Sequence, residues 1–166
     1  MYRYPRQMAL ILWLVTLCMA DSLRAQTGTD VVGTWSLVAS VAEKDGVRRE
    51  QFGAGANGVL MFDETGHFTL AIIALNLPKF ASNNRAEASG EESRAVVAGT
   101  IAMVGRYAVD KTASTLTFYV DASTFPNWAG TTQKRLIVTA SGDTLEYVTP
   151  TASSGGVGRV TWKRVP

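Results

Sequence analysis

The residues able to perform acid–base or nucleophilic chemistry are few, and their spacing assembles no catalytic set. His67 is the only histidine of the 166-residue chain, and it follows Gly66 between two apolar segments. Imidazole is the usual general base near neutral pH, but we expect this one to be exposed at a hairpin tip. With this single histidine and with Cys18 as the only cysteine, the chain has few of the residues that Ser-His-Asp, Cys-His and thiolate–metal sites require. The sequence predicts no metal ion, no cofactor and no catalytic residue.

Two carboxylates on different predicted strands leave an acid–base pair open. These are Asp121 and Glu146, and paired carboxylates in unlike environments can act as acid and base. Asp121 alternates in phase with Tyr119, which favours the interpretation that both face solvent while their apolar neighbours fill the core. In the alternative, both point into a cavity beside Arg106, Tyr107 or Arg135 and orient a ligand there. A charge inside would then need a partner.

Arg135 also has two interpretations. It follows Lys134 at the start of an otherwise apolar stretch, so it marks either a solvated strand start or a cation that binds a carboxylate or phosphate of a ligand.

Alternation of apolar and polar residues with period two predicts about eight β-strands. Their ranges are 34–43, 58–62, 67–75, 103–110, 115–121, 132–140, 144–150 and 159–165. Turn-length connections indicate an antiparallel up-and-down meander, which closes best into a barrel wide enough for one small ligand. One helix is predicted at 91–103, after the third strand, with Ser89 as its cap and acidic residues in its first turn. The fold class is therefore all-β, with one short helix.

The N-terminus predicts a cleavable signal peptide over residues 1–25. Arg3 and Arg6 precede thirteen residues without a charge, and small and polar residues follow. A membrane helix needs ~20 apolar residues, so we expect no stable membrane span. The leader also contains Arg24 and Asp21, and its removal reduces 16 basic and 14 acidic residues to 13 of each. A neutral mature chain without a basic patch predicts no nucleic-acid binding, and the leader predicts a secreted or periplasmic location.

Residues at opposite ends of the chain make the barrel more specific. Gly33-x-Trp35 on the first predicted strand, with Arg159 and Arg164 on the last, resembles the lipocalin signature. In that signature the tryptophan closes the barrel floor and a late arginine packs over its ring. Five further segments follow in the order seen in the bacterial and fungal lipocalin-like domain family: FDETGHFTL, GRYAVD, FPNWAGT, GDTLEYVTP and GRVTWKRV. The resemblance covers residues 31–165.

This resemblance implies a single calycin-type, small-ligand-binding β-barrel over residues 31–165. It also implies that Gly33, Trp35 and Arg159 close the barrel. The family often carries histidines where this chain has Phe118 and Tyr119, so chemistry that depends on those imidazoles is not expected here.

The segment FPNWAGT, residues 125–131, joins two predicted strands with loop-forming residues. Pro126 supplies no N–H and can end a strand ladder at the barrel rim. Phe125 and Trp128 would fold back over one barrel end. They contact the ligand if that end is open, and they are a structural stopper if it is the end that Trp35 closes.

We therefore expect an exported barrel that binds a small, largely apolar molecule in its cavity, with no enzymatic activity favoured. The candidate ligand-binding residues are Tyr107, Tyr119, Asp121, Phe125, Trp128 and Arg135. One alternative is an isomerase or cyclase that acts on an apolar metabolite through tyrosine and carboxylate acid–base chemistry. The other is an exported protein-interaction module, with a filled barrel and an exposed apolar patch. The sequence selects no oligomeric state.

Overall fold

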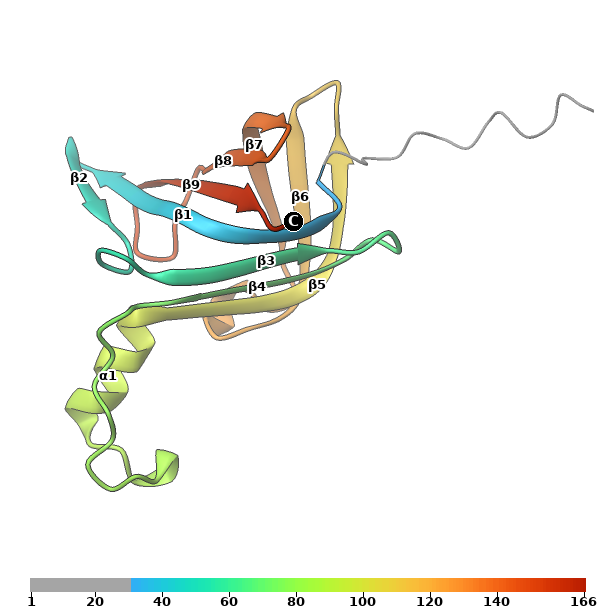
Figure 1. Cartoon of the computed structure of the whole chain (residues 1–166). Helices are drawn as coiled ribbons and strands as arrows, with labels where there is room; N and C mark the ends of the chain where they lie inside the picture. Colours follow the sequence, from blue (N-terminus) through green and yellow to red (C-terminus); the bar gives the residue numbers. More distant parts are fainter. Residues whose placement is uncertain (1–30) are drawn as a thin grey trace, which may run out of the picture.

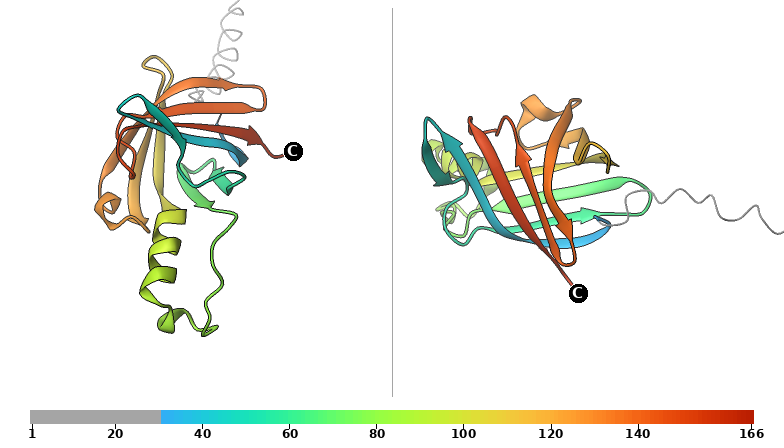
Figure 2. Two further views of the ribbon diagram at one scale, coloured as in Figure 1. Left: turned by 90° about the vertical axis from the view of Figure 1, so that its left-hand side faces the viewer. Right: turned by 90° about the horizontal axis from the view of Figure 1, so that it is seen from above.

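The strands form a single closed antiparallel sheet. The computed structural model describes residues 31–166, so the predicted signal peptide, residues 1–25, lies outside the described residues. The sheet order is β2-β1-β3-β4-β5-β6-β7-β8-β9, and β1 also pairs with β9. The strands are β1 (Gly33–Lys44), β2 (Val47–Glu50), β3 (Asn57–Phe62), β4 (His67–Ile73), β5 (Thr100–Asp110), β6 (Thr115–Ser123), β7 (Thr132–Ser141), β8 (Thr144–Thr149) and β9 (Val157–Arg164). All of them except β2 make up the barrel wall (Figures 1 and 2).

The predicted all-β, antiparallel up-and-down barrel is confirmed, with one additional strand. β2 pairs only with the second half of β1, through partners such as Val41 and Glu50. All four of its residues are exposed. The pattern VRRE has no apolar alternation, and for this reason it gave no strand signal.

The helix α1 (Gly90–Gly99) lies between β4 and β5. It follows the third strand of the barrel but the fourth strand of the chain, because β2 precedes it. The predicted range 91–103 ran too far: Ile101 and Met103 belong to β5 and are buried inside the barrel. Gly99 and the β-branched Thr100 explain the early end, since both disfavour helix and Thr favours strand.

The N-terminus of α1 has the predicted cap. The Glu92 N–H donates to Ser89 Oγ at 3.2 Å, and the Ser89 N–H donates to Glu92 Oε2 at 2.7 Å. This reciprocal pair satisfies two otherwise free N–H groups. The helix and the segment before it project away from the barrel (Figures 1 and 2), and Val97 on the helix is 75% exposed. Among the described residues, no helix is both long and apolar enough to cross a membrane.

Trp35 closes the end of the barrel at which β1 begins, here called the floor end. Its side chain is fully buried, and its indole N–H donates to the Val31 carbonyl at 2.8 Å. The guanidinium carbon of Arg164 lies 4.1 Å from the centroid of the Trp35 ring. Arg164 Nη1 also donates to the Val32 carbonyl at 2.6 Å. A large apolar plug with a cation over its ring therefore seals this end.

The Trp35 plug requires a glycine beside it. Gly33 has φ +126°, and a Cβ at this position would lie 2.8 Å from Arg164 Nη1. A side chain would both strain the backbone and push the arginine off the Trp35 ring.

The expected role of Arg159 in this closure is corrected by the structure. Arg159 is exposed on the outer wall, where it forms an ion pair with Glu146. Arg159 and Arg164 are five positions apart on β9, so their side chains point to opposite faces of the sheet. The arginine that packs on the floor tryptophan is Arg164.

Aromatic side chains fill the floor half of the barrel. The ring centroids of Phe68 and Phe118 lie 4.4 Å apart, and those of Phe62 and Phe118 lie 6.0 Å apart. Trp162 is fully buried beside them in the same core. This half is a packed core with space for no ligand, so any cavity must lie toward the other end, here called the rim end.

Candidate functional site

The segment that contains Phe125 and Trp128 lies at the rim end. Met103, near the start of β5, pairs with Ser123 at the end of β6, and β5 starts at the end of the barrel opposite to the start of β1. The segment therefore covers the end opposite to Trp35. This answers the question left open by the sequence: the aromatics lie at the end that the floor tryptophan leaves open.

A short 3₁₀ helix, η2 (Pro126–Trp128), holds Trp128 in place. Pro126 occupies its first turn, where a missing N–H costs nothing. The Trp128 N–H donates to the Phe125 carbonyl at 3.0 Å, and the Gly130 N–H donates to the Val120 carbonyl at 2.8 Å. The loop is thus tied to the end of β6. The Phe125 ring packs edge-on against Trp128 with 5.5 Å between centroids.

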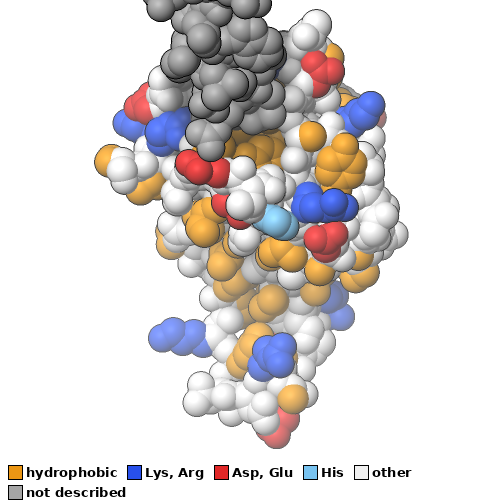
Figure 3. All heavy atoms as spheres, turned by 90° about the vertical axis from the view of Figure 1, so that its right-hand side faces the viewer, with side chains coloured by type: hydrophobic (Ala, Val, Ile, Leu, Met, Phe, Trp, Pro, Cys, Tyr) orange, Lys and Arg blue, Asp and Glu red, His pale blue; other side chains and the backbone are white. Residues whose placement is uncertain are grey.

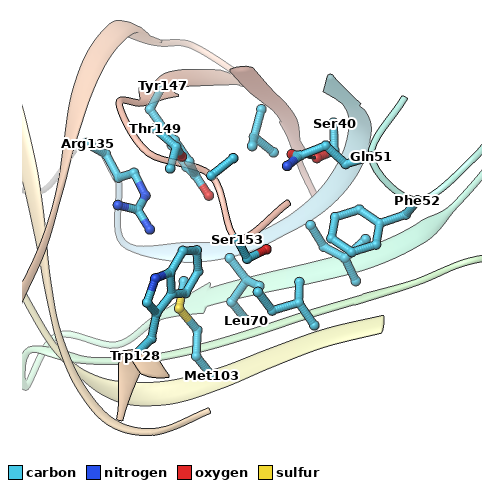
Figure 4. Close-up of a pocket in the computed structure, with 14 residues that line it drawn as sticks. Ser40, Gln51, Phe52, Leu70, Met103, Trp128, Arg135, Tyr147, Thr149 and Ser153 are labelled. Carbon is cyan, nitrogen blue, oxygen red and sulfur yellow. Dashed lines mark hydrogen bonds between the residues drawn. The ribbon is translucent and has the colours of Figure 1, made fainter. Parts of the chain in front are cut away.

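Trp128 forms one wall of a cavity of about 40 Å³ inside the rim end. Its apolar walls include Phe52, Leu70, Ile72, Ile101, Met103, Trp128 and Val160. Its polar groups come from Ser40, Gln51, Arg135, Tyr147, Thr149 and Ser153. Figure 4 shows Arg135, Tyr147 and Thr149 on one side of this cavity, with Trp128 and Met103 below them. A mostly apolar cavity with a few converging polar groups is the usual form of a small-molecule site.

Arg135 is the charged group of this cavity, and it is only 3% exposed. Its guanidinium carbon lies 5.3 Å from the Trp128 ring centroid and 5.7 Å from that of Phe118. Its Nη1 donates to the Lys134 carbonyl at 3.0 Å. The interpretation of Arg135 as a solvated strand start is therefore wrong. The side chain turns inward, as its alternation with the exposed Lys134 and Leu136 requires.

No carboxylate neutralises this cation within residues 31–166. The ion pairs of that part of the chain include His67–Asp63, Arg159–Glu146 and Lys163–Asp143, and no Asp or Glu lines the cavity. Desolvation lowers the pKa of Arg135, although a guanidinium remains protonated at any physiological pH. The buried positive charge therefore contacts two aromatic rings and one carbonyl, but no carboxylate.

Tyr147 on β8 adds a neutral hydroxyl beside this charge. The residue is 2% exposed, and burial raises the pKa of its phenol to about 12, although the nearby Arg135 opposes the shift. The register explains the proximity: β7 and β8 are antiparallel and Leu136 pairs with Val148, so Arg135 lies opposite Thr149 and diagonal to Tyr147. At neutral pH the phenol is protonated and can donate a hydrogen bond.

Three of the predicted ligand-binding residues lie away from the cavity. Tyr119 is 41% exposed and Asp121 is exposed on the outer face of β6, which corrects the alternative that placed them inside. Tyr107 is half-buried near the floor end, where its hydroxyl donates to the Asp63 carbonyl at 2.9 Å. Of the six candidates, Trp128 and Arg135 line the cavity. Phe125 packs against Trp128 without lining the cavity itself.

The other chemically capable side chains face outward. His67 is exposed at the β3–β4 hairpin, as expected, and is the pale blue side chain in Figure 3. Its Nδ1 lies 2.8 Å from Thr65 Oγ1. Glu146 pairs with Arg159 on the outer wall, so it forms no acid–base pair with Asp121. Within residues 31–166, no group of three or more His, Cys, Asp or Glu side chains could hold a metal ion.

Sequence reasoning missed Tyr147, Ser40 and Gln51. Tyr147 alternates in phase with Leu145 and Thr149, so its inward direction could have been read from TLEYVTP. Ser40 and Gln51 carried no such signal. Ser40 Oγ donates to Gln51 Oε1 at 2.8 Å, and Gln51 Nε2 donates to Ser154 Oγ at 3.1 Å across the cavity mouth. Outside these two hydrogen bonds lies a larger pocket of about 430 Å³, lined mainly by charged and polar residues together with Ala42 and Val47.

The chain was compared with families, curated proteins and solved structures. A family model described as a lipocalin-like domain matches residues 32–165. No curated protein matches the chain. Among solved structures, the chain is similar to a redesigned β-barrel at 12% identity and a TM-score of 0.44, over 83% of this chain and 94% of that chain.

Replacing the buried charge should stabilise the protein. Arg135→Met keeps most of the side-chain volume and removes a cation without an ionic partner, so we expect the free energy of unfolding to rise by about 1 kcal/mol. Urea denaturation measures the change. Lys134→Met, at the exposed neighbouring position, is the matched control and should stay within about 0.5 kcal/mol of wild type. A loss of stability in Arg135→Met alone would mean that the arginine holds the barrel together.

Alkaline pH should destabilise the protein through Tyr147. Its pKa is about 12 when folded and about 10 when unfolded, so the unfolded chain releases its proton first. The stability present below pH 10 is therefore lost as the pH rises toward 12, by on the order of 2 kcal/mol. Denaturation curves at successive pH values should show a smaller loss for Tyr147→Phe. Tyr119→Phe, which removes an exposed phenol, is the control; an equal loss in all three proteins would refute the assignment.

Proposed function

Because the chain belongs to the lipocalin-like domain family, we propose that it binds a small, largely apolar molecule in the cavity beneath Trp128. A lipocalin-like barrel suggests small-molecule binding. The observation that carries the proposal is the position of the cavity: it is apolar, contains one buried cation and lies opposite the sealed floor. Sites of this kind bind through apolar burial, and their few polar groups set the orientation of the ligand.

Trp128 is the residue that must respond to a ligand. The cavity of about 40 Å³ holds only a few water-sized groups as it stands, so a larger molecule has to displace a side chain at the rim. Trp128 is only partly buried and sits on a loop, whereas the floor residues Trp35 and Trp162 are fully buried. The Phe125–Trp128 pair therefore acts as a lid over the bound molecule.

The geometry supports binding over catalysis. An isomerase or cyclase that works through tyrosine and a carboxylate needs an Asp or Glu within hydrogen-bond reach of Tyr147. The cavity lining contains neither. An interaction module would have exposed apolar side chains and a filled barrel. Exposed apolar side chains such as Val97 and Leu136 do occur, but the rim half of this barrel contains a cavity of about 40 Å³.

The proposed location is outside the cytoplasm. Residues 1–25 have the charge and hydropathy pattern of a cleavable leader. N-terminal sequencing of the protein recovered from the periplasm or medium should start at Gln26, or at Asp21 if the earlier cut is used. Recovery of the full-length chain from the cytoplasm alone would contradict export.

Ligand binding should change the fluorescence of Trp128. Titration with 1-anilinonaphthalene-8-sulfonate, an apolar anion that fluoresces when it leaves water, should give saturable binding and quench part of the tryptophan emission. We expect Trp128→Phe to retain a folded barrel and to show less quenching, because Trp128 lines the cavity and the other described tryptophans do not. Trp128→Ala should also weaken binding, by roughly 10-fold, through loss of an aromatic wall.

Two results would count against this proposal. One is the absence of saturable binding to folded protein across a panel of apolar probes. The other is quenching that survives unchanged in Trp128→Phe, which would place the probe elsewhere.

A further inference from the structure

We propose that the ligand carries a single carboxylate group, which Arg135 binds at the inner end of the cavity while the apolar part of the ligand points to the rim. This inference rests on the proposed function, since it names the chemical class of molecule for the same cavity. It is carried by the arrangement around Arg135.

The guanidinium is positioned for an external partner. Arg135 is 3% exposed, and what remains open faces the cavity that it lines. A guanidinium has five N–H donors, and one of its nitrogens, Nη1, donates to the Lys134 carbonyl. The Trp128 and Phe118 rings attract the positive charge through their faces, but they offer no oxygen to its N–H groups.

The groups beside the cation are neutral donors or hydroxyls, so they do not supply its counter-charge. Tyr147 and Thr149 approach from the next strand (Figure 4). Burial raises the pKa of Tyr147 to about 12, which keeps its phenol protonated and able to donate a second hydrogen bond to an anion. Within residues 31–166, no acidic side chain lines the cavity. A bound anion would therefore neutralise the charge of Arg135 and accept hydrogen bonds from its guanidinium.

The charge and size of the site select a carboxylate among anions. One guanidinium matches one negative charge, and its planar fork matches the two oxygens of a carboxylate. A phosphate monoester carries about −1.5 to −2 charges near pH 7, which a single cation leaves uncompensated in an apolar cavity. The volume of about 40 Å³ suits a group of three heavy atoms with the chain passing outward beneath Trp128.

The matched ligands for the test are octanoate, octan-1-ol and octyl phosphate, which share one apolar chain. Their dissociation constants are measured by isothermal titration calorimetry on the mature protein and on three variants. Arg135→Met removes the charge, Arg135→Lys retains a cation without the planar fork, and Lys134→Met removes the neighbouring exposed charge. Circular dichroism establishes that each variant is folded.

We expect wild type to bind octanoate roughly 10- to 100-fold more tightly than octan-1-ol, as a charge-assisted hydrogen bond predicts. Arg135→Met should lose this preference. Arg135→Lys should keep part of the preference, and Lys134→Met should keep all of it.

The contrary outcomes separate this inference from the proposed function. Equal affinity of wild type for octanoate and octan-1-ol overturns the carboxylate inference and leaves small-molecule binding intact. Tighter, Arg135-dependent binding of octyl phosphate also overturns it, in favour of a phosphate group. A preference for octanoate that persists in Arg135→Met refutes the role of this residue. If neither the octyl compounds nor 1-anilinonaphthalene-8-sulfonate bind, the proposed function fails as well.

Discussion

The buried, unneutralised guanidinium of Arg135 is the constraint on which the rest of the rim depends. Transfer of a charge from water into an apolar interior is costly unless the charge is paired, and no carboxylate of residues 31–166 pairs with this one. The protein lessens the cost with what surrounds the cation: the rings of Trp128 and Phe118, the Lys134 carbonyl and the protonated phenol of Tyr147. Such a group contributes little to folding, and its retention inside a cavity is explained by a partner that arrives from outside.

Each end of the barrel pairs a tryptophan with an arginine. At the floor end, Trp35 and Arg164 form a sealed plug, in which the arginine packs on the ring and donates to two backbone carbonyls, those of Val32 and Gly142, against one for Arg135. At the rim end, Arg135 on β7 also packs on a tryptophan, but this tryptophan, Trp128, lies on a short loop beside the cavity. The same interaction is therefore structural at one end and available for recognition at the other. The difference lies in how completely each arginine is satisfied.

Much of the fold followed from local sequence patterns, because period-two alternation and turn residues report directly on strands and hairpins. The site was less accessible. The inward direction of Arg135 was ambiguous because charged residues at strand starts are usually solvated, and only the closed barrel shows which face is interior. For the same reason, the closing role predicted for Arg159 belongs to Arg164, since the two side chains lie on opposite faces of β9. Gln51 could not be foreseen, because its contact to Ser154 joins segments that are distant in sequence.

The central claim is that ligands enter at the rim and meet Arg135 beneath Trp128. Nuclear magnetic resonance tests it most directly, by following the indole N–H signals of Trp128 and Trp35 and the Arg135 Nε–H signal during addition of an apolar carboxylate. The Trp128 and Arg135 signals should shift together and saturate, while the Trp35 signal should not shift. Shifts at Trp35, or saturable shifts confined to the polar pocket between β2 and Gly155, with Trp128 and Arg135 unchanged, would contradict it.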